Sequence, residues 1–436
     1  MTMPAVDVAL DVSWLGNTYG QRWMRTGIHR VVERTAVVLG ARPDVRLRLC
    51  ATEHRDDAVA YAATEPALRA MRFAGDWATW VPDRLRRAKA VLEARGRRPA
   101  LPIRLTRRAL GEAHRGLTAA ARRLRREPAD TALTPAMLAG ADIFHSTLSP
   151  LPGAAPGGRG PRRFLTVYDV FPQLMPALSW QGADAWSRRM TDSVGPGDWV
   201  LAISQYTKND LLTLRPDLDP ERVVVTYLGA DRDRFYPCDD GERRAATRRR
   251  YGIPEGVPYL LSVGSLVPHK NLPHLLRTFA ELVRTERVGD LHLVLTGPKA
   301  WDSDAFGALL GGADARRERV ILTGHVDDEE LAPLYSGALA FVFPSLYEGF
   351  GLPPLEAMQC GVPVIASDAA SLPEVVGDGG ILVGPHDGDA LAQAVLDVYG
   401  DAAGRARLAA RALARAACFS WERYADETVA AYRRAL

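Results

Sequence analysis

The chain has 436 residues, of which 47% are apolar and 25% are charged, and its formal net charge is +3. This composition is that of an ordinary globular protein, and the length predicts two or three domains, each large enough for its own core. No stretch approaches the roughly 20 consecutive apolar residues of a membrane-spanning helix, which excludes the integral membrane class.

The first residues predict a strand over 6–12 and not a signal peptide, because no basic leader precedes them and acids interrupt the apolar run. The four cysteines lack the paired spacing of a zinc or redox motif, so reduced thiols in a cytoplasmic protein are expected. They are Cys50, Cys238, Cys360 and Cys418.

In the first half of the chain, predicted strands alternate with predicted helices. The strand over 6–12 leads into a glycine-containing loop over 14–27, and apolar residues then recur at helical spacing over 28–39. A helix over 205–214 begins after Ser204, a residue type that caps helices. The other predicted strands cover residues 45–51, 142–146, 163–169, 199–204 and 223–229.

Positive charge is concentrated in one segment. Between Asp83 and Arg126 there are 15 Lys and Arg against 3 Asp and Glu, a local charge of +12, so the rest of the chain carries −9. Ala, Leu and Arg recur there at roughly helical spacing with a break at Pro99 and Pro102, which predicts an inserted helical hairpin over 82–127. Such a run is usually a solvated helix face, and the alternative is an anionic partner such as a membrane surface, a lipid-phosphate acceptor or an acidic protein. No aromatic residues interleave the arginines, which argues against nucleic acid.

The second half repeats the alternation after a polar stretch over 238–250, which is typical of an interdomain linker. Predicted strands cover 259–264, 291–296, 319–322, 340–344, 362–367 and 380–383, and predicted helices cover 272–284, 329–336, 353–358, 372–376 and 389–399. Two rounds of alternation predict an α/β protein with two doubly wound parallel-sheet domains that face a cleft.

The segment over 343–358 combines two glycines, two prolines and two acids. Glu348 follows a predicted strand, and the glycines after it allow backbone N–H groups to approach a ligand closely. The prolines suit the first turn of the next helix, whose positive end suits a diphosphate. Glu356 in that turn can accept hydrogen bonds from both vicinal hydroxyls of a ribose. The alternative is that both glutamates only cap the helix and balance its dipole.

A second loop over 262–271 also follows a predicted strand and precedes a predicted helix. Lys270 in this loop can reach a phosphate as a point charge, and Gly264 and Ser265 can present backbone N–H groups beside it. A lone loop lysine is usually only solvated, so the functional interpretation depends on the glutamate segment being nearby.

The two segments resemble those of glycosyltransferase family 4, retaining enzymes of the GT-B fold, and specifically its mannosyltransferase-like members. The spacing of Glu348 and Glu356 is similar to that family's Glu-x7-Glu motif. The resemblance is strong over about 195–436 and thinner in the N-terminal half of the chain, where it rests on 26–31, 166–172 and 202–212. Further matches in the strong part are 263–271, 324–331, 360–367, 372–375 and 419–422.

The resemblance implies a role for each matching position in the donor site. It assigns the ribose to Glu356 and the diphosphate to Lys270. It assigns the transferred sugar and its phosphate to Glu348 together with the backbone of the loop that follows, which is Gly349, Phe350, Gly351 and Leu352. It also implies that Gly27 lets the N-terminal loop approach the diphosphate across the cleft.

The resemblance further implies that a last helix over 421–434 crosses back to the N-terminal domain. We therefore predict an N-terminal acceptor-side domain over 1–240, completed by 418–436, and a donor-binding domain over 246–417. Two departures from the family pattern matter: Tyr168 stands where a histidine is usual, and His269 stands beside the lysine where arginine is usual. The second departure predicts a positive charge that depends on pH.

Several other residues lie near predicted edges of the cleft. Asp169 ends a strand and is a candidate to orient the acceptor or act as a base, with Tyr168 and His29 as further acceptor-side candidates. His29 and His145 are equally explained as hydrogen-bonded polar residues of the interior. Three aromatic residues of the first loop are candidates to stack on a sugar or lipid acceptor or to belong to the core, and they are Trp14, Tyr19 and Trp23.

The predicted reaction transfers a hexosyl group from a nucleoside diphosphate sugar to a hydroxyl of a glycan, a lipid-linked saccharide or a small molecule. Glu348, Lys270 and Asp169 are the predicted catalytic residues, and no cofactor or metal is expected because no Asp-x-Asp motif is suitably placed. The resemblance of 297–301 and the segment from Gly324 to mannosyltransferase-type members favours GDP-mannose as donor.

Three alternatives share the scaffold: a pseudo-glycosyltransferase that couples cyclitol units, an epimerase that releases an isomeric sugar nucleotide, and an inactive sugar-nucleotide-binding scaffold. The predicted location is the cytoplasm, with peripheral contact to the inner face of the membrane through the basic hairpin.

Overall fold

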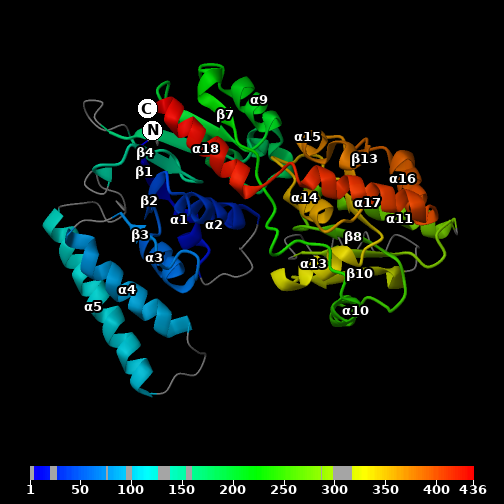
Figure 1. The fold of residues 1–436 in the computed structure, drawn as a ribbon, viewed down its shortest axis with the longest axis horizontal. Coiled ribbons are helices and arrows are strands. Elements are labelled where there is room, and N and C mark those ends of the chain that lie inside the picture. The colour runs from blue at the N-terminus through cyan, green and yellow to red at the C-terminus, as the bar shows by residue number, and fades with distance from the viewer. Residues whose placement is uncertain are drawn as a thin grey trace.

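The computed structural model describes residues 4–19, 27–74, 77–94, 101–125, 138–153, 160–285, 287–297 and 317–436. These residues form two α/β domains that lie side by side, with the N-terminal half of the chain in one and most of the C-terminal half in the other (Figure 1). Both sheets are parallel throughout, as the alternation of strands and helices predicts.

The N-terminal sheet has seven strands in the order β3-β2-β1-β4-β5-β6-β7. Val8 of β1 pairs with Leu47 on one side and Ile143 on the other, and all three side chains are apolar, because both faces of the sheet are covered by helices. The strands are β1 (Val6–Asp11), β2 (Val45–Cys50), β3 (Arg72–Phe73), β4 (Ile143–Ser146), β5 (Arg162–Val167), β6 (Trp199–Ala202) and β7 (Val223–Val225).

The helices of this domain follow the predicted order. Ser204 caps α9, since its side chain accepts a hydrogen bond from the Thr207 amide, which confirms the predicted start of that helix. The helices that cover the sheet are α1 (Ser13–Asn17), α2 (Gly27–Gly40), α3 (Arg55–Thr64), α7 (Phe171–Leu174), α8 (Ala183–Asp192) and α9 (Gln205–Leu214).

The basic segment is a helical hairpin of α4 (Trp77–Ala94) and α5 (Leu101–Arg125), as predicted. It projects from the N-terminal domain on the side away from the other domain (Figure 1). The first helix begins before the predicted start at 82 and continues through Pro82. Ion pairs tie the hairpin to α3 and its N-cap region, with Arg55 Nη2 2.7 Å from Asp83 Oδ2 and Arg86 Nη2 2.7 Å from Asp57 Oδ1.

The C-terminal sheet has six strands in the order β10-β9-β8-β11-β12-β13. The strands are β8 (Tyr259–Val263), β9 (His292–Thr296), β10 (Val320–Gly324), β11 (Ala340–Phe343), β12 (Val364–Ser367) and β13 (Gly380–Val383). The helices are α10 (Gly241–Arg250), α11 (Leu272–Arg284), α13 (Asp328–Ser336), α14 (Leu352–Gln359), α15 (Leu372–Val376), α16 (Gly388–Gly400) and α17 (Ala402–Ala416).

The polar stretch predicted as a linker over 238–250 is largely helix, because α10 covers 241–250. Asp240 caps this helix by accepting from the Arg243 amide. Arg250 Nη2 lies 2.7 Å from Asp327 Oδ2, and the Thr247 hydroxyl donates to Glu330 at 2.5 Å. The composition is polar because the helix has a solvated face, and it packs on the C-terminal domain next to α13.

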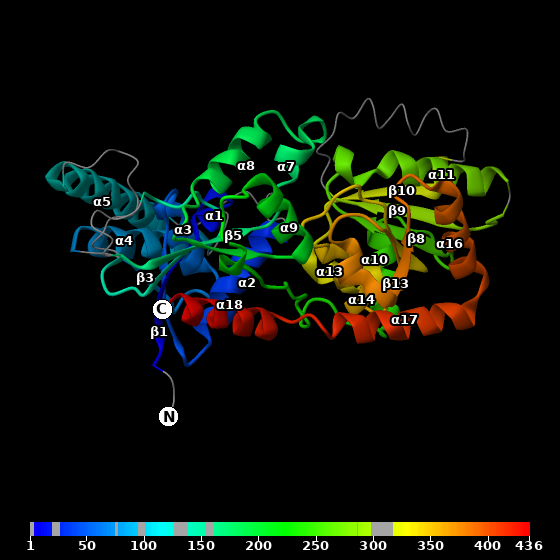
Figure 2. The ribbon, with the colours of Figure 1, turned by 90° about the horizontal axis from the view of Figure 1, so that it is seen from above.

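The last helix, α18 (Trp421–Ala435), crosses back and lies along the N-terminal domain (Figures 1 and 2). Its apolar face joins a core cluster with residues of β1, β4, β5 and β6. The Tyr432 hydroxyl lies 2.6 Å from His145 Nδ1, and the Thr35 hydroxyl donates to Tyr424 at 3.1 Å. The crossing implied by the resemblance is thus present.

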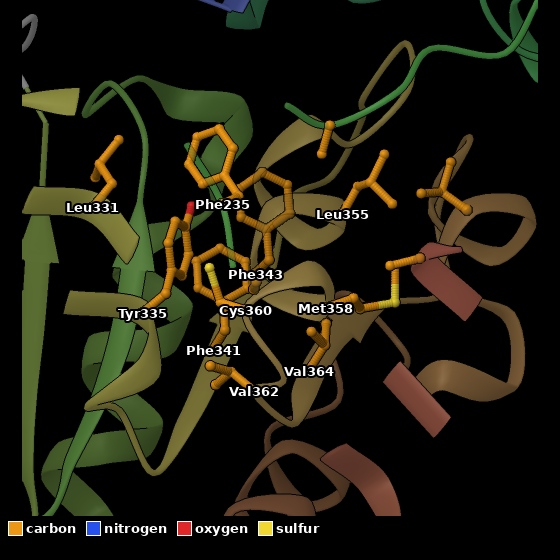
Figure 3. Packing of buried hydrophobic residues seen from close by; sticks show 14 of the residues in the cluster. Phe235, Leu331, Tyr335, Phe341, Phe343, Leu355, Met358, Cys360, Val362 and Val364 are labelled. Carbon is orange, nitrogen blue, oxygen red and sulfur yellow. The ribbon is translucent and has the colours of Figure 1, made fainter. Parts of the chain in front are cut away.

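A tightly packed core supports α14 within the C-terminal domain. Phe341 and Phe343 of β11 lie in one buried cluster with Tyr335, Leu355 and Met358 (Figure 3), and the Phe341 ring packs against those of Tyr335 and Phe343. Because these side chains are fully or almost fully buried, the start of α14 is fixed relative to the end of β11. Across the described residues, no helix is long and apolar enough to cross a membrane.

Candidate functional site

The loop between β11 and α14 lies where the two domains meet. Gly351 has φ +109°, a value that favours glycine, and α14 begins at the next residue. Pro353 and Pro354 remove two of the helix's free N–H groups, and Leu355 N donates back to Gly351 O at 3.2 Å. Among the described residues, the amides of 349–351 find no protein acceptor, so the loop, more than the helix end, is the candidate anion site.

Lys270 and Glu348 meet at the carboxyl ends of β8 and β11. Lys270 Nζ donates to Glu348 Oε1 at 2.6 Å, and the Ser345 hydroxyl donates to the same oxygen at 2.6 Å. Both charged side chains are largely buried. The structure therefore brings the two predicted loops together, since parallel neighbouring strands end at the same edge of the sheet.

The loop after β8 forms the other wall beside Lys270. Gly264 has φ +151° and its amide donates to Thr296 O at 2.9 Å. A small cavity there is lined by Gly264, Ser265, Lys270, Thr296 and Phe343, among others. The Lys270 ammonium lies 4.8 Å from the centre of the Phe343 ring. Gly264 and Ser265 thus lie beside Lys270, but the Gly264 amide already donates to Thr296 O, so the predicted N–H group at this position is not free for a phosphate.

Glu356 is 2% exposed and lies one turn into α14. Arg30 Nη2 of α2 lies 3.0 Å from Glu356 Oε1, and the Tyr335 hydroxyl donates to Oε2 at 3.2 Å. Burial raises the pKa of the Glu356 carboxyl, and Arg30 opposes that shift. Arg30 was not predicted as a site residue. The signal that could have found it is its place one helical turn after Gly27, on the same face of α2.

The two domains touch closely at this loop. A Cβ on Gly349 would lie 2.0 Å from Tyr168 O, so only glycine fits there. The Thr207 hydroxyl donates to Gly349 O at 3.1 Å across the cleft. A Cβ on Gly27 would lie 3.4 Å from the Leu352 side chain. Gly27 thus lies close to Leu352 of the opposite domain, and its implied approach to the diphosphate stays a prediction.

Asp169 lies at the same point on the N-terminal side. Its carboxylate accepts a hydrogen bond from the Phe171 amide at 3.1 Å. Burial raises the pKa of Asp169 to about 6; the nearby Glu348 charge raises it and Lys270 lowers it. The three predicted catalytic residues, Asp169, Glu348 and Lys270, therefore interact electrostatically.

Three other predicted or considered residues are not at the cleft surface. His29 is buried, with Nδ1 2.7 Å from the Thr18 hydroxyl and Nε2 2.9 Å from the Tyr61 hydroxyl. His145 is buried, and burial lowers its pKa to about 3. The Tyr168 side chain packs in the core, and its carbonyl faces Gly349. The structure thus corrects the acceptor-side placement of His29 and of the Tyr168 ring, because both are held by interior contacts.

Two further expectations concern side chains beside the site. Burial and, to a smaller extent, the charge of the neighbouring Lys270 lower the pKa of His269 to about 4. The ring is therefore neutral near neutral pH and adds no positive charge beside Lys270. Of the first-loop aromatics, Trp14 and Tyr19 pack against a core cluster, and Trp23 lies outside the described residues.

Two residues that the sequence did not identify hold the loop before α14 and the contact between the domains. The Ser371 hydroxyl lies 2.9 Å from Glu348 O and 2.8 Å from Phe350 O, so one side chain ties down two carbonyls of the loop. Glu374 of α15 accepts from the amides of Gln205 and Tyr206 at 2.9 Å each and so caps α9 of the other domain. The short helix over 372–376 therefore connects the domains.

Comparison with known proteins gives matches for the C-terminal half. Residues 243–415 match the model of a family described as glycosyl transferases group 1. O-antigen chain mannosyltransferase B of Escherichia coli is 35% identical over 246 residues, which are 56% of this chain and 63% of that protein. D-inositol 3-phosphate glycosyltransferase of a Nocardioides species is 38% identical over 255 residues, 56% of this chain and 55% of that protein. The chain thus covers less than two thirds of the length of either relative.

A solved structure extends the likeness over both domains. Sucrose-phosphate synthase from Thermosynechococcus elongatus matches with a TM-score of 0.63 at 20% identity, over 99% of this chain and 98% of that chain. At this identity the likeness shows the fold alone. Both domains and their arrangement are those of the predicted GT-B fold.

Proposed function

We propose that this chain, whose residues 243–415 match the model of the group 1 glycosyl transferases, transfers a hexosyl group from a nucleoside diphosphate sugar to a hydroxyl with retention of configuration. The observation that carries the proposal is the pairing of Lys270 with Glu348 at 2.6 Å beside the free amides of the loop before α14. Positive charge and oriented N–H groups at one point suit a diphosphate that gains negative charge as it leaves.

The proposed step breaks the bond between the anomeric carbon and the diphosphate oxygen. The acceptor oxygen bonds to that carbon on the same face through an oxocarbenium-like state, and its proton passes to the departing phosphate oxygen. Lys270 and the loop amides stabilise the leaving charge, and Glu348 holds the sugar hydroxyls. Asp169 orients the acceptor from the opposite domain. No protein nucleophile or metal enters this scheme.

For the donor, we favour GDP-mannose. The support is that the Escherichia coli relative is a mannosyltransferase, together with the resemblance of 297–301 and the segment from Gly324 to mannosyltransferase-type members. The proposed acceptor is a glycan or a lipid-linked saccharide, and the proposed location is the cytoplasm with peripheral contact to a membrane through the basic hairpin.

The experiment is a donor screen with the purified chain. GDP-mannose, GDP-fucose, UDP-glucose, UDP-galactose and UDP-N-acetylglucosamine are each incubated with it in the presence of EDTA, and release of nucleoside diphosphate is measured. Hydrolysis of one donor above the others is expected. Product masses separate the alternatives: an isomeric sugar nucleotide indicates an epimerase, and a coupled cyclitol indicates a pseudo-glycosyltransferase. Binding without turnover of any donor, with any acceptor offered, would favour an inactive scaffold.

A further inference from the structure

Three consecutive carbonyl groups of the loop between β11 and α14 are held by side-chain hydroxyls. The Ser371 hydroxyl lies 2.9 Å from Glu348 O and 2.8 Å from Phe350 O, and both contacts stay within the C-terminal domain. The Thr207 hydroxyl of α9 in the N-terminal domain donates to Gly349 O at 3.1 Å. Two of the carbonyls are therefore bound by a residue of their own domain, and the one between them is bound by a residue of the other.

The bound carbonyls decide which way the amides of the loop point. A trans peptide is planar, so the C=O of one residue and the N–H of the next point in opposite directions. The three contacts therefore orient the N–H groups of Gly349, Phe350 and Gly351, and within the described part of the chain these groups have no acceptor. Phe350 and Gly351 are buried, and a buried N–H group without an acceptor is rare. The amides are thus both oriented and available to a ligand.

Glu374 of α15 holds the start of α9, the helix that carries Thr207. Its Oε2 accepts hydrogen bonds from the Gln205 amide and the Tyr227 hydroxyl, and its Oε1 accepts one from the Tyr206 amide, each at 2.9 Å. Thr207 is the next residue of the helix. Because Glu374 lies three residues after the serine that binds the loop, α15 contacts the loop at one end and α9 at the other.

The Thr207 hydroxyl lies between a carbonyl of each domain. It is 3.1 Å from Gly349 O and 3.3 Å from Tyr168 O of its own domain, and it accepts from the Ser204 hydroxyl at 3.0 Å. With the domains apart, Tyr168 O is the acceptor that remains for its single proton. The direction of the Phe350 amide therefore depends on contact between the domains, whereas its two neighbours are oriented within one domain.

We propose that Ser371 and Thr207 are positioning residues that aim the amides of 349–351 at the phosphate attached to the transferred sugar, and that Glu374 acts through Thr207. The inference rests on the proposed function. Successive N–H groups that are oriented before the ligand arrives form a concave site for anionic oxygens. Because one of the three is set by the opposite domain, this phosphate site is complete only with the cleft closed.

The test compares nucleotides that differ only in their outer phosphate. GDP with GMP, and UDP with UMP, are titrated into the purified chain by calorimetry in the presence of EDTA. The wild-type chain is expected to bind one diphosphate more tightly than the matching monophosphate. Thr207→Val and Ser371→Ala each remove one hydroxyl, and each should lower the diphosphate affinity about tenfold, because an oriented hydrogen bond to a charged oxygen is lost. The monophosphate affinity should stay unchanged.

Three further variants sharpen the comparison. Thr207→Ser keeps the hydroxyl and should keep the wild-type ratio of the two affinities. Thr213→Val removes an exposed hydroxyl of the same helix, which donates to Asn209 O at 2.9 Å, and should keep that ratio as well. Glu374→Gln cannot accept at both positions, so it should weaken diphosphate binding alone. Combined with Thr207→Val, it should bind no more weakly than Thr207→Val, since both act on one contact.

Circular dichroism verifies the fold of each variant, and Ser371→Ala carries the test if Thr207→Val does not fold. Unchanged diphosphate affinity in the folded hydroxyl variants overturns the inference. An equal loss for diphosphate and monophosphate also overturns it, because that result indicates a general structural role. Additive losses in the double variant overturn the role of Glu374. A wild-type chain that binds neither diphosphate, or binds it no better than its monophosphate, overturns the proposed function itself.

Discussion

Glu348 Oε1 accepts hydrogen bonds from both Lys270 and Ser345, each at 2.6 Å, so the lysine charge is held in one place at the proposed diphosphate site. A diphosphate that enters must compete with Glu348 for that charge. The positive charge is therefore placed before the donor arrives, at no cost in side-chain ordering during the reaction.

Lys270→Ala is expected to lower turnover more than donor binding, because the leaving group's negative charge grows toward the transition state. We expect kcat to fall about 100-fold or more, as for loss of one preorganised donor at a developing charge. Steady-state kinetics with a soluble acceptor measures the effect. If KM rises while kcat is preserved, Lys270 binds ground state and transition state equally.

Glu356→Ala is expected to weaken donor binding chiefly. The variant removes charge-assisted hydrogen bonds to the ribose, worth about 1.5–3 kcal/mol, so the affinity should fall about tenfold or more by calorimetry. The variant also leaves Arg30 without its 3.0 Å partner, so its fold must be verified by circular dichroism. Unchanged affinity in a folded protein would refute the ribose assignment.

Gly349→Ala is expected to impede closure of the cleft. The new Cβ would lie 2.0 Å from Tyr168 O of the other domain, and backbone on both sides cannot yield easily. We expect kcat/KM to fall about tenfold or more and the radius of gyration in X-ray scattering to increase. Gly197→Ala is the matched control, because no described atom lies within 4 Å of its Cβ position. Equal activity of the two variants would contradict the closed arrangement.

Because the pKa of Asp169 is raised from 3.8 to about 6, both the activity and the stability of the protein are expected to depend on pH. If the ionised carboxylate orients the acceptor, kcat/KM falls about tenfold per pH unit below about pH 6. Burial favours the neutral form, so the unfolding free energy should decrease as the pH rises from 3.8 to about 6. Asp169→Asn should lower activity and flatten both profiles. An acid limb that persists in this variant assigns the titration to another group.

The basic hairpin is predicted to dock on an anionic membrane surface. Each arginine near such a surface contributes about 1 kcal/mol, and salt should weaken the attachment. Co-sedimentation with anionic and neutral vesicles at low and high salt should show selective recovery with anionic vesicles, lost when Arg122, Arg123, Arg125 and Arg126 are changed to Ser. Four exposed arginines of the C-terminal domain provide the control variant, and they are Arg249, Arg277, Arg287 and Arg411. Equal recovery with both vesicle types would refute membrane docking. A solvated helix face or a protein partner would then explain the positive charge of the hairpin.

The sequence predicted those parts of the site that lie within one domain. Lys270 and Glu348 follow parallel strands, so the sheet topology alone brings them together. Arg30 and Glu374 escaped prediction because their partners belong to the opposite domain, and no spacing in one segment encodes a contact across a cleft. The acceptor-side prediction for His29 was wrong for a related reason. Helical periodicity predicts which face of the helix His29 lies on, but it does not predict that Tyr61 and Thr18 lie there as interior hydrogen-bond partners. The polar composition over 238–250 likewise indicated only that the segment is exposed to solvent. A helix with a solvated face has the same composition as a linker, so the two could not be distinguished.

The position of α18 has a consequence for synthesis of the protein. Val429 and Tyr432 of this helix cover apolar residues of the N-terminal sheet, yet they are translated after the whole C-terminal domain. While the ribosome makes the intervening residues, that face of the first domain stays uncovered. The N-terminal domain must therefore acquire its final packing after translation of the second domain, and its exposed apolar face is a candidate for transient chaperone binding.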